Sequence, residues 1–243
     1  MIWSVPKSWV GSTCIIIASG PSMKTVDLSV LKSVYPQPRV ITINDSWRLY
    51  PTADAHYFCD AVWWDEQVKR NYTAVDGFTR FTDRIYAGFW VKGSPSSEKS
   101  FHEHREVHVL EFTGQLGLET DPHGLRHGSN SGYQAINLVY HFGASKIVLL
   151  GYDMKCSGNM THWHGGRSEP SGYFAGVLKR TMLPLFEHLV KPLESAGIEV
   201  LNATPDSALK CWPLVTVETA LRLDHFPLPC TGGGDRISGG VDA

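Results

Sequence analysis

Six short apolar runs constrain the fold of this chain more than any other feature of its sequence. They lie at residues 13–18, 39–43, 55–59, 107–112, 146–150 and 198–201. The first and fifth runs are apolar almost throughout rather than alternating, which is typical of strands buried on both faces. Turn-rich or helical segments separate the runs, so the sequence predicts an α/β fold: a mostly parallel sheet flanked by helices, in a Rossmann-like arrangement.

Two helical regions follow from the pattern between these runs. The better defined one extends from Tyr133 to Phe142, with Ser131 as the expected N-cap and Gly143 as the residue that ends it. The second lies at about 172–196 and contains two prolines, Pro184 and Pro192, which should break or kink it.

The domain organisation is predicted to be simple. Residues 1–225 are expected to form a single α/β nucleotide-binding domain, since 243 residues suffice for one large core. Residues 66–125 are interpreted as an irregular insert or flap, because their section 66–106 is polar and rich in turn residues. Residues 226–243 are rich in proline and glycine and are expected to be a disordered tail.

Composition excludes several function classes. The net charge of −2 argues against broad binding to nucleic acid or anionic lipid. We expect no transmembrane segment, because no apolar run approaches the roughly 20 residues that a bilayer requires, and no signal peptide at the N-terminus. The five cysteines show no CxxC spacing, which favours reduced thiols in a cytoplasmic protein.

Two glycine–serine turns, each next to an apolar run, suggest a nucleotide site. Ser19, Gly20, Pro21 and Ser22 follow the first run, where backbone N–H groups could approach a phosphate closely. The second turn, at 128–132, contains Ser131 and Gly132 and opens the helix before the fifth run. One nucleotide held between two crossovers of the sheet would explain both. The spacing is neither that of a P-loop nor GxGxxG, so an ordinary strand-to-helix turn is the alternative.

Polar side chains follow three further runs, where ligand crevices form in open α/β sheets. Asn44 could bond a base or ribose, or it could form an Asx turn. Asp60 could hold a ribose hydroxyl or a metal, and the neighbouring Trp63 and Trp64 could stack on a ring, although tryptophan pairs more often belong to a core. Asp153 could orient a sugar or bind a cation, and Lys155 is a natural partner for a phosphate.

The segment 161–167 has the composition most typical of a catalytic segment in this chain. His162 and His164 flank Trp163 and lead into two glycines and an arginine. A histidine general base is the first interpretation, because imidazole accepts protons near neutral pH. A loop without chemistry comes second. Zinc comes third, since no further ligands stand out nearby. The histidines at 102, 104, 108, 123 and 127 are assigned to the solvated surface by default.

These motifs, taken together, resemble glycosyltransferase family 42, the bacterial sialyltransferases, and the related domain-of-unknown-function family 115, whose skeleton phage proteins also share. The resemblance rests on residues 18–24, Asn44, Ser131-Gly132 before a helix, 146–153 and 202–207, and spans roughly 13–60 and 126–210. The chain departs from the family pattern at Ser19, where asparagine is usual, and at Lys155, which replaces a tyrosine. Its segment between Asp153 and the histidines is also shorter.

The resemblance implies a sialyltransferase-like fold and an inverting, metal-independent transfer from a nucleotide-sugar donor such as a CMP-sugar to a glycan or small-molecule acceptor. It implies that the Gly20, Pro21 and Ser22 turn, Asn44 and the Ser131-Gly132 pair embrace the nucleotide. It also implies that His162 or His164 acts as base, and it allows a homo-oligomer.

Two alternatives remain open at this point. One is a diphosphokinase-like transferase of pyrophosphate from ATP, in which Mg²⁺ would be held by Asp60 and Asp153. The other is a non-catalytic nucleotide-binding protein that kept the fold.

Overall fold

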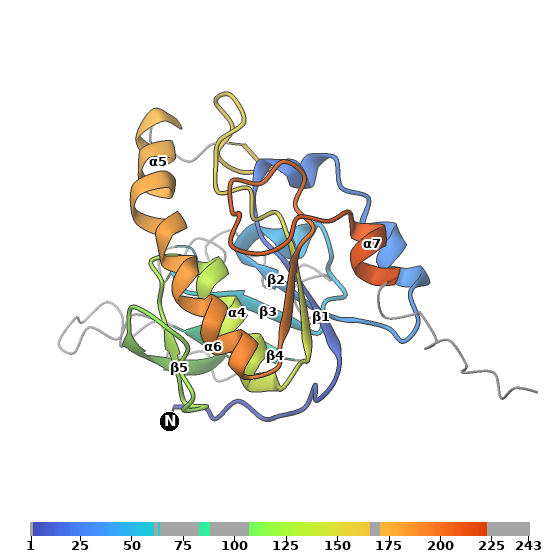
Figure 1. Cartoon of the computed structure of the whole chain (residues 1–243), viewed down its shortest axis with the longest axis vertical. Helices are drawn as coiled ribbons and strands as arrows, with labels where there is room; N and C mark the ends of the chain where they lie inside the picture. The colour runs from blue at the N-terminus through green and yellow to red at the C-terminus, as the bar shows by residue number, and fades with distance from the viewer. Residues whose placement is uncertain (1, 61–62, 64–82, 88–106, 166–170, 223–243) are drawn as a thin grey trace, which may run out of the picture.

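The computed structural model of the chain describes residues 2–60, 63, 83–87, 107–165 and 171–222. They form an eight-stranded sheet in the order β6-β5-β4-β3-β2-β1-β7-β8, and every neighbouring pair is parallel. The predicted α/β fold with a parallel sheet is therefore confirmed (Figure 1).

All six predicted strands are present, and the sheet holds two more. The strands are β1 Thr13–Ile17, β2 Arg39–Ile43, β3 Ala55–Phe58, β4 Asp83–Ala87, β5 Val107–Gly114, β6 Gly124–Arg126, β7 Lys146–Leu150 and β8 Glu199–Asn202. The sequence analysis missed β4 and β6. Within the expected irregular insert at 66–125, the sheet is continued by β4, by β5, which was predicted at 107–112, and by the start of β6. The expected tail at 226–243 lies outside the described residues.

Helix α4, Ser131–Phe142, begins two residues earlier than predicted, and its N-cap is Asn130 rather than Ser131. Asn130 has an extended backbone, and its side-chain oxygen accepts the N–H of Tyr133 at 2.9 Å. This is the hydrogen bond that defines a cap. Gly143 ends the helix at φ 86°, as predicted, because glycine adopts the left-handed conformation without steric cost.

The second helical region changes its hydrogen-bond pattern along its length. It consists of α5 Ser171–Val177, the π-helical segment η5 Leu178–Met182, the 3₁₀ segment η6 Leu183–Phe186 and α6 Glu187–Ser195. Pro184 lies in the first turn of η6, where the missing N–H is tolerated. Pro192 lies inside α6 and does not end it, contrary to a simple break.

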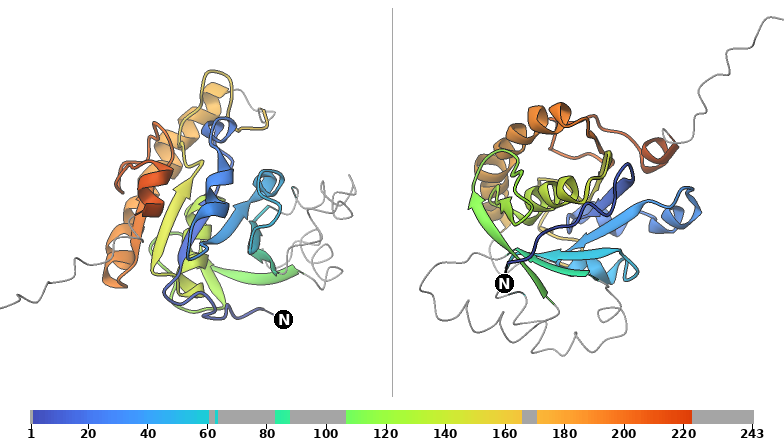
Figure 2. Two further views of the ribbon diagram at one scale, coloured as in Figure 1. Left: turned by 90° about the vertical axis from the view of Figure 1, so that its right-hand side faces the viewer. Right: turned by 90° about the horizontal axis from the view of Figure 1, so that it is seen from below.

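Alternate residues of the central strand, β1, pack into two hydrophobic cores, one on each face of the sheet. Cys14 and Ile16 of β1 belong to the core that contains α4 and α6. Ile15 and Ile17 belong to the other, which contains residues of α7 Val217–Arg222 and of the 3₁₀ segments η1 Pro21–Lys24, η2 Leu28–Ser33 and η3 Asn44–Arg48. Figure 2 shows this layered arrangement from two further sides. Burial on both faces explains why these strands read as continuous apolar runs.

The strand order reverses at β1. Strands β2 to β6 lie to one side of it and β7 and β8 to the other. The connections that follow β1 and β7 therefore lead away in opposite directions and open a crevice at the carboxyl ends of these two strands. Ligands of open α/β sheets bind at such a switch point.

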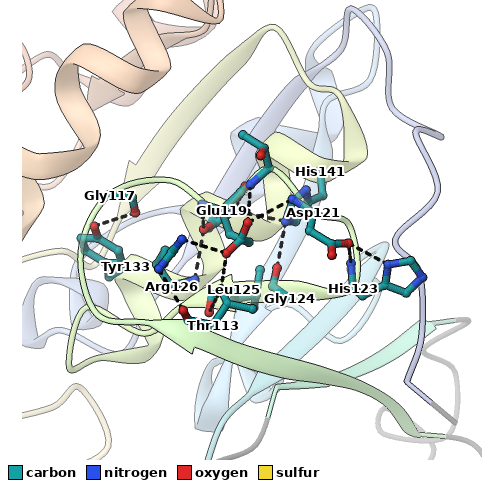
Figure 3. A network of polar contacts seen from close by, with 12 residues as sticks. Thr113, Gly117, Glu119, Asp121, His123, Gly124, Leu125, Arg126, Tyr133 and His141 are labelled. Carbon is teal, nitrogen blue, oxygen red and sulfur yellow. Dashed lines mark hydrogen bonds and ion pairs between the residues drawn. The ribbon is translucent and has the colours of Figure 1, made fainter.

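A polar network fastens the β5–β6 edge of the sheet to its surroundings (Figure 3). The buried carboxylate of Glu119 accepts the N–H groups of Thr120 at 2.9 Å and Asp121 at 3.1 Å, accepts the hydroxyl of Thr113, and pairs with Arg126 at 3.2 Å. Burial acts to raise the pKa of Glu119, but these hydrogen bonds and the arginine outweigh it and lower the pKa below its ordinary value.

Replacing Glu119 by glutamine is expected to lower the free energy of unfolding by about 1–3 kcal/mol at neutral pH, because buried donors lose a charged acceptor. A carboxylate with a depressed folded pKa stabilises above its unfolded pKa and loses that effect as the pH falls. The difference between wild type and E119Q in urea unfolding should therefore hold from about pH 7 to pH 5 and shrink as the pH falls below about 4.5. A difference that is absent at pH 7, or that does not narrow, would contradict this assignment.

Candidate functional site

A cavity of about 460 Å³ lies at the switch point, a size typical of small-molecule sites. Its polar wall comes from the residues after β1, β2, β3 and β7 and from the start of α4. Its apolar wall comes from α5 and η5. Of the predicted site residues, the cavity lining includes Ser19, Gly20, Pro21, Asn44, Asp60, Ser131, Gly132, Asp153, Lys155 and His162. It does not include Ser22 or His164.

Three N–H groups of the turn after β1, those of Gly20, Ser22 and Met23, are bonded within the chain. Ser22 donates its backbone N–H to Oδ1 of Asp153 at 3.0 Å and its hydroxyl to Oδ2 at 2.8 Å. The N–H of Gly20 bonds to the carbonyl of Gly151 at 3.0 Å, and that of Met23 to the carbonyl of Gly20. Pro21 has no N–H. The N–H groups of Gly20, Ser22 and Met23 therefore have acceptors within the chain, and binding of a phosphate at this turn stays a prediction that these three amides do not support.

Asp153 instead fastens this turn to the end of β7. Its side chain is buried, and burial raises the pKa of Asp153 although the hydrogen bonds from Ser22 act in the other direction. The approach is close enough to require glycine at position 20, where an added Cβ would lie 1.9 Å from Oδ2 of Asp153 and 2.4 Å from the carbonyl oxygen of Gly151. The geometry thus supports a positioning role for Asp153, which also lines the cavity, and its expected contact with a sugar or cation stays a prediction.

The start of α4 presents backbone donors to the cavity. Asn130 caps the N–H of Tyr133, whereas the N–H groups of Ser131 and Gly132 have no acceptor among the described residues. Both residues line the cavity. Gly132 is held close to the ring of Tyr152, whose hydroxyl donates to the Gly132 carbonyl at 3.0 Å. A helix N-terminus with unpaired N–H groups favours an anion.

Asn44 occupies a strained position at the end of β2. Its φ is +48°, which is uncommon for a residue other than glycine, and its buried Oδ1 accepts no hydrogen bond within the described part of the chain. The expected alternative, an Asx turn, requires that oxygen as a local acceptor and is not formed. Asn44 therefore keeps a buried acceptor at the cavity, and the sequence analysis placed it correctly.

Both the hydroxyl and the backbone carbonyl of Ser19 form hydrogen bonds within the chain. The hydroxyl donates to the carbonyl of Ile43 at 3.2 Å and lies 3.0 Å from that of Ser46. Its own carbonyl accepts the N–H of Trp163 at 3.1 Å, which ties the histidine segment to the turn after β1.

Asp60 and Lys155 both lie at the rim of the cavity. Asp60 is exposed. The Lys155 ammonium pairs with the carboxylate of Asp206, which is itself largely exposed. Because an ammonium group has three donors, this exposed pair does not prevent Lys155 from contacting a phosphate, and that contact stays a prediction. Trp63 packs against Phe58 and donates to Asp45 at 3.0 Å, as a core residue would, and Trp64 lies outside the described residues.

The structure separates the two candidate bases. His162 lines the cavity, with Nδ1 at 2.9 Å from the hydroxyl oxygen of Thr161. His164 stacks on it, with ring centroids 5.3 Å apart, but is not among the residues that line the cavity. Nε2 of His164 is 3.7 Å from Asp45. Burial lowers the pKa of His164, against the effect of Asp45 and together with that of Arg48.

The sequence analysis missed several lining residues. His127 was assigned to the surface by default, yet it lines the cavity, as do Gln134, Phe174, Leu178 and Met182. The position of His127 directly before the second glycine turn was the available signal. Of the other default surface histidines, His123 pairs with Asp121 and His108 stacks on Trp3. Those at 102 and 104 lie outside the described residues.

Within the described ranges, no group of three or more histidine, cysteine, aspartate or glutamate side chains could hold a metal ion. No helix in that part of the chain is long and apolar enough to cross a membrane. The described cysteines, at 14, 59, 156 and 211, form no disulfide among the described residues.

No protein-family model and no curated protein matches the sequence. Solved structures do match the fold. The sialyltransferase CstII from Campylobacter jejuni, in complex with the substrate analogue CMP-3FNeuAc, is 14% identical over 84% of this chain and 86% of its own, with a TM-score of 0.53. The monofunctional α-2,3-sialyltransferase Cst-I from the same organism is 13% identical over 84% of this chain and 80% of its own, at 0.52.

The MAf glycosyltransferase from Magnetospirillum magneticum AMB-1 is 13% identical over 89% of this chain but only 36% of its own length, at a TM-score of 0.56. At these identities the similarity shows the fold: the chain has the α/β fold of the bacterial sialyltransferases.

Proposed function

We propose that this chain is an inverting glycosyltransferase that takes a CMP-sugar as its donor. One observation carries the proposal: a cavity at the switch point brings together the imidazole of His162 with the N–H groups at the start of α4 and the amide oxygen of Asn44, which have no hydrogen-bond partner among the described residues. These are an anion site, an acceptor for a base or ribose, and a proton acceptor.

The donor phosphate would bind at the N-terminus of α4. The N–H groups of Ser131 and Gly132 would bind its oxygens, and the positive end of the helix dipole would stabilise the charge that develops as the CMP leaves. Backbone donors provide this without a metal. The Asn44 oxygen would accept from a ribose hydroxyl or from the amino group of cytosine. CstII has been solved with CMP-3FNeuAc and Cst-II with CMP, which makes CMP compounds the first donors to test.

His162 would act as the general base. Its ring would take the proton from a hydroxyl of the acceptor, a glycan or small molecule, while that oxygen forms a bond to the anomeric carbon. The bond between this carbon and the phosphate oxygen breaks at the same time, and CMP departs with the electron pair. His164, stacked behind His162 and outside the cavity lining, would support the ring rather than contact the acceptor.

A thermal-shift panel tests the donor class. CMP, CDP, UDP, ADP, ATP and CMP-sialic acid would each be added with Mg²⁺ and with chelator. A ligand at 100 times its dissociation constant stabilises by about 2.7 kcal/mol, so a true donor should raise the melting temperature clearly above the others. We expect the CMP compounds to do so in chelator. A shift confined to ATP with Mg²⁺ would overturn the proposal in favour of a pyrophosphoryl transferase, and no shift with any nucleotide would overturn it altogether.

A further inference from the structure

The carboxylate of Asp45 joins three segments of the chain beside the candidate site. Its Oδ1 accepts a hydrogen bond from the guanidinium of Arg48 at 2.9 Å, three residues further along η3. Its Oδ2 accepts the indole N–H of Trp63 at 3.0 Å and lies 3.7 Å from Nε2 of His164. The Asp45 side chain is 19% exposed and is not among the residues that line the cavity. Asp45 thus makes its contacts to protein groups rather than to the cavity.

One of these segments is the histidine hairpin, residues 162–165. Its two end residues exchange backbone N–H···O hydrogen bonds of 3.2 Å in both directions. Two such bonds do not fix a short hairpin, since even a longer one is marginally stable in water by itself. Contacts with the rest of the chain fix it instead. The N–H of Trp163 donates to the Ser19 carbonyl at 3.1 Å, and the guanidinium of Arg48 lies 5.1 Å from the centre of the Trp163 ring.

The ring of His162 is held by its neighbours. Its centroid lies 5.3 Å from that of His164 and 5.5 Å from that of Phe174, and its Nδ1 is 2.9 Å from the hydroxyl oxygen of Thr161. His164 in turn lies at ion-pair distance from Asp45. A path of direct contacts therefore leads from Asp45 through His164 to the proposed base.

The surroundings of His164 suit a ring that stacks on a base. Burial lowers the pKa of His164; Asp45 acts against this effect and Arg48 adds to it. A neutral His164 does not repel the positive charge that His162 gains when it takes a proton. The stacked pair can therefore carry that charge on the ring that lines the cavity.

We propose that Asp45 is a positioning residue for the general base: its carboxylate fixes the histidine hairpin so that His162 stays in the wall of the cavity. The inference deepens the proposed function and rests on it, because His162 is the base only under that proposal. Asp45 directly follows Asn44, so one short segment carries both a proposed nucleotide contact and the support of the base. A misplacement of about 1 Å can lower a rate about 100-fold, which makes such support matter for turnover.

Two substitutions of Asp45 remove different parts of this support. Asp45→Ala removes both acceptor oxygens, whereas Asp45→Asn keeps the shape and one acceptor but loses the charge that pairs with Arg48. Asp54→Ala is the matched control, because Asp54 likewise pairs with an arginine, Arg39, at 2.7 Å and its side chain is 28% exposed. Arg39 begins β2 and Asp54 precedes β3, at the strand ends opposite to the cavity.

Release of CMP from CMP-sialic acid measures turnover in each variant, alone and combined with His162→Ala. We expect D45A to lower turnover about tenfold or more, and D45A/H162A to release CMP as fast as H162A, because Asp45 acts only through the base. The affinity for CMP in calorimetry should stay close to that of the wild type, and D54A should retain wild-type turnover. Should D45A not fold, D45N takes its place, with an expected loss of about threefold or more.

A merely structural role of Asp45 would act even without the base, so a further loss of turnover in D45A/H162A would overturn the inference. Wild-type turnover in D45A, or in D45N where D45A does not fold, would overturn it as well. The same holds for an equal loss in D54A, or a loss of CMP affinity as large as the loss of turnover. These outcomes leave the proposed function intact. A wild type that releases no CMP would overturn the proposed function, and the inference with it.

Discussion

Replacing His162 by alanine is expected to lower turnover of the CMP-sugar about a hundredfold or more, while the affinity for CMP changes little. A positioned general base contributes typically 10²–10⁴-fold to a rate, and His162 is the one of the two candidate bases that lines the cavity. The nucleotide contacts proposed at α4 and Asn44 remain in this variant. Release of CMP from CMP-sialic acid measures turnover, and calorimetry with CMP measures affinity.

His164→Ala serves as the matched comparison, because the two rings stack but His164 lies outside the cavity lining. We expect a smaller loss of turnover in H164A than in H162A, and the double variant to resemble H162A. A larger loss in H164A would exchange the roles of the two histidines. Unchanged turnover in the double variant would show that neither His162 nor His164 is the general base.

Replacing Gly20 by alanine is expected to lower the free energy of unfolding by about 3 kcal/mol or more, at the upper end of what overpacking costs. The added Cβ would meet the Asp153 carboxylate and the backbone carbonyl of Gly151, and the carbonyl cannot rotate away as a side chain does. For a domain of this size the melting temperature should fall by roughly 6–12 °C. The two strand ends at the switch point would also move apart, so CMP binding should weaken.

Gly172→Ala is the control for this experiment. Gly172 lies in α5, and an added Cβ there meets nothing within 4 Å. Alanine should leave the melting temperature unchanged or raise it slightly through helix propensity. Equal melting temperatures for G20A and wild type would show that the close packing of β1 against β7 is not required.

The fold was predictable from the sequence where burial leaves a local trace. The strands with continuous apolar runs were found, because burial on both faces selects the same residue types at every position. The three-residue β6 was missed, since a strand as short as Gly124–Arg126 has no periodicity to read. The N-cap was misplaced by one residue because Asn130 and Ser131 are both good caps, and the backbone conformation decides between them.

The site was predictable in position but not in the use of its hydrogen bonds. Strand ends predicted Asn44 and Asp153 at one crevice from topology, whereas His162 was singled out from the composition of the segment 161–167 and from the family resemblance. That Ser22 donates to Asp153, over 131 residues of chain, is a tertiary contact with no local signal. The same holds for Lys155 and Asp206, 51 residues apart. These tertiary contacts are the reason why we propose the phosphate site at the second glycine turn rather than at the first.

An NMR titration of the ¹⁵N-labelled protein with CMP, in chelator, tests the central claim most directly. The account predicts saturable changes that are largest at the amides of Ser131 and Gly132, whose N–H groups have no acceptor among the described residues, and smaller at Gly20 and Ser22, whose N–H groups are already bonded. Largest changes at the turn after β1, or no changes at the start of α4, would contradict it.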